Sequence, residues 1–346
     1  MNQGWPQAFG SERELDDFLT RPRPALVESA AEFAGGLLVL GVGGKMGHTL
    51  ARMARRALDE AGLRARVVGV SRFSDSSVSA ALQADGIETI SCDLMDPRAV
   101  ARLPELSNVV FMAGRKFGSS GGEARTWAVN AYVPGIVASR FPSCRLLAFS
   151  TGNVYPFVEP GSGGAGEATP PGPIGEYAQS CLGRERVFEH FCAEQGTKTI
   201  LIRLNYAVEL RYGVLVDLAQ SVWRGEPIDL AMSHVNVIWQ GDAVDMILRA
   251  LPHADSPIAY LNVTGPETVS IRDAAEGLGR RLGRAPLFSG RERGTALLAN
   301  VDKACHLLGR PEVDVERMLD WIAAWTRSGG RTLGKPTHFS EREGRF

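Results

Sequence analysis

A glycine-rich turn directly after a short apolar run constrains the fold of this chain more than any other sequence feature. The run over 37–40 is Leu-Leu-Val-Leu, which is typical of a parallel strand buried on both faces. Gly41, Gly44 and Gly47 follow at intervals of three, and a helical pattern over 46–61 comes next. In this context the spacing is typical of dinucleotide binding, because the glycines permit a sharp turn, close phosphate approach and tight helix packing. A glycine-rich turn without a ligand is the less favoured alternative.

Apolar runs and helical patterns alternate along the chain that follows. Strands are expected over 66–70, 88–92, 109–112, 145–150 and 199–204, with helical segments between them. A regular βαβ alternation predicts a parallel sheet with helices on both faces. We therefore predict an α/β fold, a doubly wound parallel-sheet Rossmann domain with a smaller C-terminal α/β substrate lobe.

The same pattern predicts how the chain is divided into domains. We expect an N-terminal helical extension over 1–34 and an NAD(P)-binding Rossmann domain over 35–205, to which 231–250 return. Segments 206–230 and 251–330 are assigned to the substrate-binding lobe, with a strand over 259–263, and 331–346 to a C-terminal tail. A further strand is expected over 235–239, within the returning segment. The Gly- and Pro-rich stretch 156–173 is expected to form a long surface loop.

Composition argues against several function classes. The formal net charge is -1, so no global field favours nucleic acid or an anionic membrane. We find no secretory signal, and no apolar run approaches the roughly 20 residues that span a bilayer. The five cysteines show neither paired nor metal-ligand spacing. These features predict a cytoplasmic protein with reduced thiols and without a metal, nucleic-acid or membrane partner.

Further motifs follow the glycine turn in an order that resembles the extended short-chain dehydrogenase/reductases, the NAD-dependent epimerase/dehydratase family. The matching segments are Cys92-Asp93-Leu94, Val110-Phe111-Met112-Ala113-Gly114, Asn130, Phe149-Ser150-Thr151-Gly152-Asn153-Val154-Tyr155, Tyr177-Ala178-Gln179-Ser180-Cys181 and Ile238-Trp239-Gln240-Gly241-Asp242-Ala243. The resemblance extends over about 37–263. It implies a homodimer formed through the helix that carries Tyr177, where Val187, Phe188 and Phe191 serve either a partner or the core.

The resemblance also implies a nicotinamide cofactor. Relatives that use NAD usually carry an acidic residue at the end of the second strand, where this chain has Ser71 followed by Arg72. An arginine there can bind a 2′-phosphate, so NADP(H) is preferred and NAD(H) is the alternative. The cofactor-binding residues expected on this basis are Gly41, Gly43, Gly44, Lys45, Met46, Gly47, Ser71, Arg72, Asp93, Leu94, Met112, Ala113, Gly114, Asn130, Tyr177 and Asn205.

The catalytic residues implied by the resemblance are Tyr177, as general acid/base, and Thr151, which orients the substrate. The family's Tyr-x-x-x-Lys motif places a lysine one turn later to assist the tyrosine, but this chain has Cys181 there. A neutral thiol cannot lower the pKa of a phenol, and a thiolate would raise it. Three explanations stay open. Another cation (Arg184, or the pair Arg115-Lys116) replaces the lysine, Cys181 is itself a catalytic nucleophile or acid, or the site binds cofactor without turnover.

Four residues are candidates for substrate contact. They are Arg115, Lys116, Asn153 and Tyr206. Adjacent cations suit a carboxylate or phosphate, and solvent-facing charges are the alternative. The sequence thus predicts an NAD(P)-dependent epimerase/dehydratase-like oxidoreductase that acts on a sugar, nucleotide sugar or related polyol. The alternative is an NADP(H)-binding regulator or scaffold that has lost catalysis.

Overall fold

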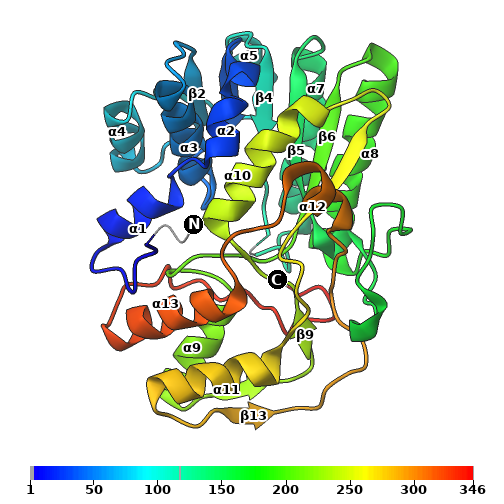
Figure 1. The fold of residues 1–346 in the computed structure, drawn as a ribbon. Coiled ribbons are helices and arrows are strands. Elements are labelled where there is room, and N and C mark those ends of the chain that lie inside the picture. Colours follow the sequence, from blue (N-terminus) through cyan, green and yellow to red (C-terminus); the bar gives the residue numbers. More distant parts are fainter. Residues whose placement is uncertain (1–3, 117, 346) are drawn as a thin grey trace.

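The computed structural model describes residues 4–116 and 118–345, and within them seven strands form one parallel sheet. The strand order is β11-β6-β5-β4-β1-β2-β3, which confirms the predicted Rossmann fold (Figure 1). The strands are β1 (Leu37–Leu40), β2 (Val67–Ser71), β3 (Glu88–Ser91), β4 (Asn108–Phe111), β5 (Arg145–Thr151), β6 (Thr199–Leu204) and β11 (Ala259–Val263). Their ends differ from the predicted ones by one residue at most.

Strand β1 lies at the point where the strand order reverses. Leu37 pairs with Val67 of β2 on one side and with Asn108 of β4 on the other. In an open α/β sheet a crevice forms at this point, outside the carboxyl ends of the strands. Gly41 directly follows β1, so the glycine turn borders that crevice.

Helices cover both faces of the sheet, because successive side chains of a strand point to opposite sides. Leu37 and Val39 belong to one core cluster, whereas Leu38 and Leu40 belong to another. The first layer includes α2 (Pro24–Glu28), α3 (Gly47–Glu60), α10 (Gln240–Ala250) and α12 (Asp302–Leu308). The second layer includes α5 (Pro97–Ala101), α7 (Val133–Arg140) and α8 (Gly175–Gln195). Helix α4 (Ser76–Ala84) connects β2 to β3.

The helical segment between β4 and β5 is interrupted by a π-helical turn. It consists of α6 (Glu123–Trp127), the turn η2 (Ala128–Tyr132) and then α7. Pro134 has no N–H to donate to the carbonyl of Asn130, four residues earlier, so the regular helical ladder cannot continue there. Such turns often occur at functional sites, and this one contains the buried Asn130.

A smaller lobe packs below the carboxyl ends of the strands in Figure 1. Its helices are α9 (Val214–Arg224), α11 (Ile271–Leu282) and α13 (Val315–Arg327). Short strands pair around them: β8 (Pro227–Asp229) with β13 (Leu287–Ser289), β9 (His234–Val235) with β12 (Val269–Ser270), and β7 (Ala207–Val208) with β10 (Ile238–Trp239).

Two expectations about this region need correction. Strand β11 is hydrogen-bonded to β6, so residues 259–263 belong to the Rossmann sheet and not to the substrate lobe. The single strand expected over 235–239 is split into β9 and β10, which pair with different partners. In both cases the pairing partner is distant in sequence, and a local apolar pattern does not specify it.

The N-terminal extension contains α1 (Glu12–Leu19), α2 and the turn η1 (Ala30–Phe33), and it contacts both the Rossmann domain and the smaller lobe. Arg23 forms an ion pair with Asp242 of α10. Phe9 and Phe18 pack edge-on against Trp321 of α13, with ring centroids 5.2 and 5.4 Å away.

The C-terminal segment 331–345, which we call the strap, passes between the main sheet and the smaller lobe (Figure 1). Thr337 donates hydrogen bonds to Asp217 Oδ2 from its backbone N at 2.7 Å and from Oγ1 at 2.6 Å. Arg342 Nη1 donates to the carbonyl of Thr295 at 2.7 Å. The backbone of Gly344 lies against Gly175, the first residue of α8.

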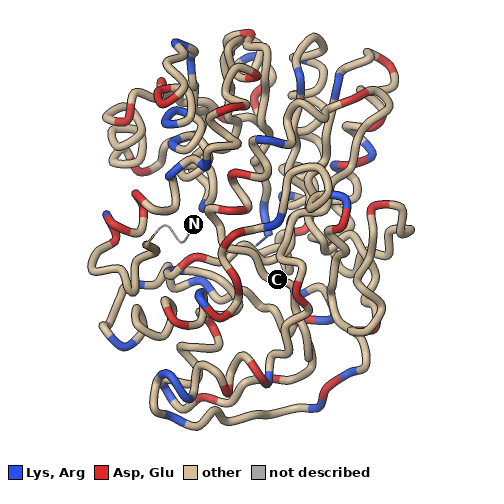
Figure 2. The backbone as a smooth tube through the Cα atoms, in the orientation of Figure 1, with Lys and Arg blue, Asp and Glu red and all other residues tan. Residues whose placement is uncertain are grey.

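Positions of basic and acidic residues are interspersed along the backbone, as Figure 2 shows. Within the described residues, no helix is both long and apolar enough to cross a membrane.

Candidate active site

The glycine turn forms a tight cradle at the start of α3. Gly41 has φ +93°, and a Cβ there would come within 2.7 Å of the backbone N of Ala113. A Cβ on Gly47 would collide with the carbonyl of Val42, so the turn can pack on its helix only with glycine at this position. The N-terminus of α3 presents N–H groups without helical partners, which suits a phosphate.

One cavity of about 570 Å³ runs from this cradle toward β2 and β3. It brings together the residues predicted to hold the adenosine half of a dinucleotide. Among the residues that line it are Gly41, Gly43, Gly44, Ser71, Arg72, Asp93, Leu94, Met112, Ala113 and Gly114. Arg72 and Asp93 are exposed at its rim, and Ser71 is half-buried.

A second cavity of about 390 Å³ lies on the other side of the cradle, toward the smaller lobe. The predicted residues Lys45, Met46, Gly47, Thr151, Asn153, Tyr177, Asn205 and Tyr206 line it. Gly41, Gly44, Met112, Gly114, Arg115 and Lys116 line both cavities, so the two adjoin. A phosphate cradle between two adjoining cavities fits an extended dinucleotide.

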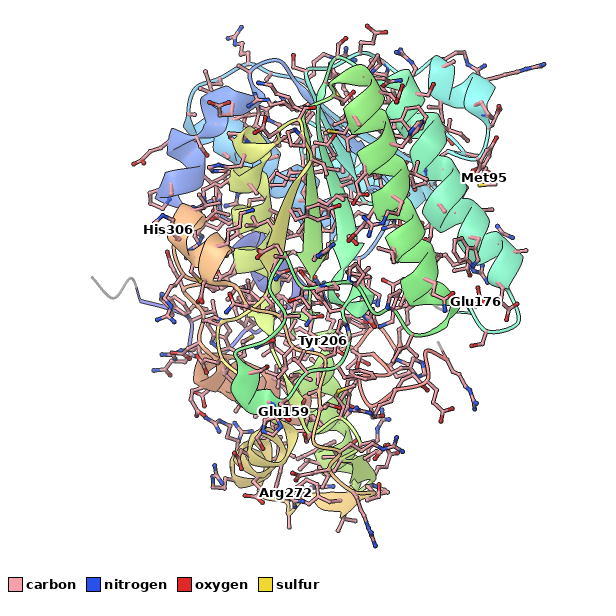
Figure 3. The ribbon with its side chains drawn as sticks, turned by 90° about the vertical axis from the view of Figure 1, so that its right-hand side faces the viewer. Met95, Glu159, Glu176, Tyr206, Arg272 and His306 are labelled. Carbon is pink, nitrogen blue, oxygen red and sulfur yellow. The ribbon has the colours of Figure 1, made fainter. Side chains whose placement is uncertain are left out.

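Thr151 and Tyr177 meet in the second cavity. Thr151 ends β5, and its Oγ1 accepts hydrogen bonds from Asn153 N at 3.2 Å and from Asn153 Nδ2 at 3.1 Å. Burial raises the pKa of Tyr177, and a hydrogen bond with Thr151 and the charge of Arg184 act in the opposite direction. The phenol is therefore protonated at neutral pH, and added positive charge is needed to ease its ionisation. Glu176, the neighbour of Tyr177, lies at the end of α8 that faces the smaller lobe (Figure 3).

Cys181 has the environment of a core thiol. It is completely buried among Val154, Tyr155, Ala165 and Ala299, and among the described residues it lines neither cavity. Burial raises the pKa of its thiol, which disfavours the thiolate that a nucleophile requires.

Asn130 is buried behind the cavity wall and does not itself line either cavity, as far as the described residues show. Its Oδ1 accepts from Arg115 N at 2.8 Å, and its Nδ2 donates to the carbonyl of Arg115 at 2.9 Å. The same Nδ2 lies 2.9 Å from Ser180 Oγ, which in turn donates to the carbonyl of Tyr177 at 2.8 Å. Asn130 thus fixes the loop after β4 relative to the helix that carries Tyr177.

Two lysines face the second cavity. The Lys45 amine lies 3.2 Å from the centroid of the Tyr212 ring, and burial lowers its pKa to about 7. Lys116 Nζ lies 3.4 Å from the carbonyl of Thr337 in the strap, and burial lowers its pKa to about 8. Arg115 lines the same cavity, so cations from two loops border it.

The remaining predicted residues lie where the second cavity meets the smaller lobe. Tyr206 has φ +35°, an uncommon conformation for a non-glycine residue that tends to occur at functional sites. Figure 3 places Tyr206 between the main sheet and the smaller lobe. Asn205 Nδ2 lies 3.4 Å from the carbonyl of Leu297, so its amide also contacts the wall of the lobe.

Sequence reasoning missed several lining residues. Tyr212 and Thr337 line the second cavity, but both come from segments without a local motif. Gln240, which belongs to one of the segments that resemble the family, lines it as well. Sequence reasoning also missed a buried network under the site, in which Arg203 forms a bidentate pair with Glu185 at 2.7 and 3.0 Å. Glu185 Oε1 also accepts from Ser150 Oγ at 2.6 Å. The only signal for this network was the polar residues inside otherwise apolar segments.

Comparisons with known proteins agree with this geometry. A sequence model of the NAD dependent epimerase/dehydratase family matches residues 37–262. No curated protein matches the chain in sequence.

Solved structures with the same fold have low sequence identity to this chain, so the likeness establishes the shared fold alone. UDP-glucose 4-epimerase from Thermotoga maritima, with UDP-glucose, has 19% identity and a TM-score of 0.69, covering 85% of this chain and 99% of that one. UDP-glucuronic acid 4-epimerase from Bacillus cereus, with NAD, has 18% identity and a TM-score of 0.70, covering 84% and 98%. Pal from Bacillus thuringiensis has 17% identity and a TM-score of 0.70, covering 84% and 99%.

Proposed function

The chain belongs to the NAD-dependent epimerase/dehydratase family, and on that premise we propose that it is an NAD(P)-dependent oxidoreductase that acts on a sugar, nucleotide sugar or related polyol. One observation carries the proposal. Thr151 and Tyr177 share the wall of a cavity that adjoins the glycine cradle. Both hydroxyls can therefore reach a substrate carbon placed beside a cofactor in the cradle.

Each hydroxyl has a distinct role in this proposal. A bound nicotinamide supplies the capacity to accept a hydride and to return it. Tyr177 takes a proton from the substrate hydroxyl as that carbon is oxidised, and gives it back on reduction. Thr151 holds the substrate oxygen in line with the phenol. Thr151 is buried and Tyr177 is half-buried, so the protein walls limit the access of water to both groups.

The cations around the cavity support an acidic substrate group. Lys45, Arg115 and Lys116 border the space beside Tyr177. A carboxylate or phosphate would neutralise charges that burial otherwise penalises. Two similar structures are named as a UDP-glucose 4-epimerase and a UDP-glucuronic acid 4-epimerase. UDP-glucuronic acid carries such a carboxylate.

For the cofactor we favour NADP(H) over NAD(H). Ser71 takes the position of the acidic residue that would repel a 2′-phosphate, and the exposed Arg72 lies at the rim of the same cavity. Calorimetric titration with both dinucleotides tests this preference. Tighter binding of NAD(H) would reject it.

The catalytic assignment is tested by Tyr177→Phe. We expect nicotinamide-dependent turnover to fall at least ~100-fold, with the dinucleotide dissociation constant changed by less than about threefold. Tyr212→Phe is the matched control, because it removes a hydroxyl from the same cavity. Unchanged turnover in Tyr177→Phe would exclude Tyr177 as the acid/base.

A cofactor-binding regulator or scaffold is the second candidate, and the observation that favours it is the cysteine at position 181. Tight dinucleotide binding without turnover on a panel of sugars, sugar acids and nucleotide sugars would support it.

For either function we propose a homodimer formed through α7 and α8. The exposed Tyr132 lies beside these helices, and light scattering measures the mass directly.

A further inference from the structure

We infer that Arg184 supplies the positive charge and the N–H donors that a lysine at position 181 would give to the Tyr177 site. This inference rests on the proposed function and extends it by naming the cation. Arg184 follows Tyr177 by seven residues on α8, about two turns of helix, so both side chains lie on one face. A long helical side chain points back toward the N-terminus, which brings the guanidinium toward the tyrosine.

The guanidinium is fixed at the wall of the Tyr177 cavity. Nη1 donates to the carbonyl of Phe149 at 2.7 Å, and Nη2 donates to Asn130 Oδ1 at 2.9 Å. Nε lies 3.3 Å from the carbonyl of Asn130, to which Pro134 has no N–H to donate. These partners lie in β5 and η2, so the position of the charge is set by the sheet and by the π-helical turn.

Arg184 keeps hydrogen-bonding capacity for a ligand. A guanidinium has five N–H donors, and the bonds to Phe149 and Asn130 within the described chain use three of them. The side chain is only 5% exposed, yet it lines the Tyr177 cavity. Buried donors at a cavity wall favour a ligand with acceptor oxygens, and the ribose hydroxyls beside a nicotinamide are such acceptors.

A glycine makes room for this arrangement. Gly114 lies at the junction of the two cavities, and a Cβ there would come within 2.9 Å of Arg184 Nη2. Because the guanidinium is held by backbone carbonyls, it could not easily move aside for a larger residue. The sequence thus combines a cysteine at 181, a glycine at 114 and an arginine at 184.

The electrostatics agree with the geometry. The charge of Arg184 lowers the pKa of Tyr177, opposing burial and the neighbouring Cys181. Lys116 is the rival cation, with Nζ 5.7 Å from the centroid of the Tyr177 ring. Its amine also contacts the strap and, with a pKa of about 8, loses its charge in mildly alkaline solution. A guanidinium keeps its charge throughout this range.

The first experiment measures binding and does not depend on turnover. Arg184 lines the Tyr177 cavity and is absent from the described residues around the adenosine-side cavity. Arg184→Gln should therefore weaken NAD(P) binding about tenfold in calorimetry, and should change ADP binding by less than about twofold. Equal losses for both ligands, or no loss for either, would overturn the inference. Lys116→Met, measured in the same way, is the control for the rival cation.

The second experiment separates charge from structure. Arg184→Lys retains a cation and should keep kcat within about tenfold, whereas Arg184→Gln, whose amide can replace the Nε hydrogen bond to the carbonyl of Asn130, should lose about 100-fold. Adding Cys181→Lys to Arg184→Gln should recover at least ~10-fold of that loss. In the wild-type background, Cys181→Lys should give no gain, because the charge is already present. A large gain there, or equal losses in the Lys and Gln variants, would contradict the role of Arg184.

The failure of this inference can be distinguished from failure of the proposed function. If no sugar is turned over, the proposed function fails, and the comparison of NAD(P) with ADP still decides whether Arg184 holds the nicotinamide end. If turnover is found and requires Tyr177 but is indifferent to Arg184, the proposed function stands and the cation is a different one.

Discussion

Lys45 follows the central glycine of the cradle, in an environment that disfavours a charged amine. Burial and the nearby charges of Lys116 and Lys335 lower its pKa to about 7, whereas an exposed lysine has a pKa near ~10.4. Between these values the unfolded chain holds a proton that the folded chain has released. Linkage then requires the contribution of this residue to the free energy of unfolding to increase as pH rises above about 7.

Replacing the amine should therefore have a pH-dependent effect. We expect Lys45→Met to raise the melting temperature relative to wild type more at pH 6 than at pH 9, because only at pH 6 does the wild-type fold hold a buried cation. Thermal unfolding at several pH values measures the difference. Lys198→Met, at an exposed site, is the control and should show no such trend. A pH-independent offset in Lys45→Met would contradict the expectation.

Single residues also show how far sequence reasoning extends. The glycine cradle could be predicted from a local turn after an apolar strand, whereas Thr151 and Tyr177 were expected only from the motifs that resemble the family. The position of the Arg184 guanidinium could not be predicted, because the carbonyls that fix it belong to β5 and to a π-helical turn. Asn130 was expected to bind cofactor, whereas its amide holds the backbone of Arg115.

Among the elements, the strap is held by hydrogen bonds at several points, which include Thr337 and Arg342. Thr337 makes two hydrogen bonds to the half-buried Asp217, and partial burial raises the pKa of that carboxyl. Nothing in the tail sequence indicated a docking position, since it contains neither an apolar stripe nor a motif. Its placement follows from complementary groups on the smaller lobe.

Thr337→Val should loosen the strap while leaving the fold intact. Losing one hydrogen bond to a carboxylate costs roughly 1.5–3 kcal/mol, so amide exchange over 331–345 should become about tenfold faster or more. Hydrogen exchange read by mass spectrometry measures this, and peptides from α8 serve as the internal standard. Thr332→Val, which makes the same substitution elsewhere in the strap, is the matched control. Unaltered exchange of the strap would mean that the Asp217 contact does not hold it.

At the scale of the whole molecule, the N-terminal extension joins the Rossmann domain to the smaller lobe. Its aromatic residues Phe9 and Phe18 pack on Trp321, while Arg23 pairs with Asp242. The Rossmann architecture itself was predictable, because alternating apolar runs specify a parallel sheet. The contacts between the extension and α13 could not be predicted, since they join segments about 300 residues apart.

We expect Phe9→Ala to lower the free energy of unfolding by about 3 kcal/mol, because it leaves a cavity among packed rings. Denaturant titration measures the loss. Leu287→Ala, at a side chain that is 52% exposed, should cost less than about 0.5 kcal/mol. A loss in Phe9→Ala as small as this control would show that the extension adds little to the joint between the lobes.

The helix that bears Tyr177 is fastened on both sides, by Glu185 to Arg203 and Ser150 and by Ser180 to Asn130. Such a helix has little freedom to shift against the sheet during a reaction cycle. Opening of the site for ligand exchange must then come from the strap and the smaller lobe. On the proposed function, the Tyr177 hydroxyl would thus keep its orientation during ligand exchange, and the rate of product release would depend on the strap, whose Thr337 lines the same cavity.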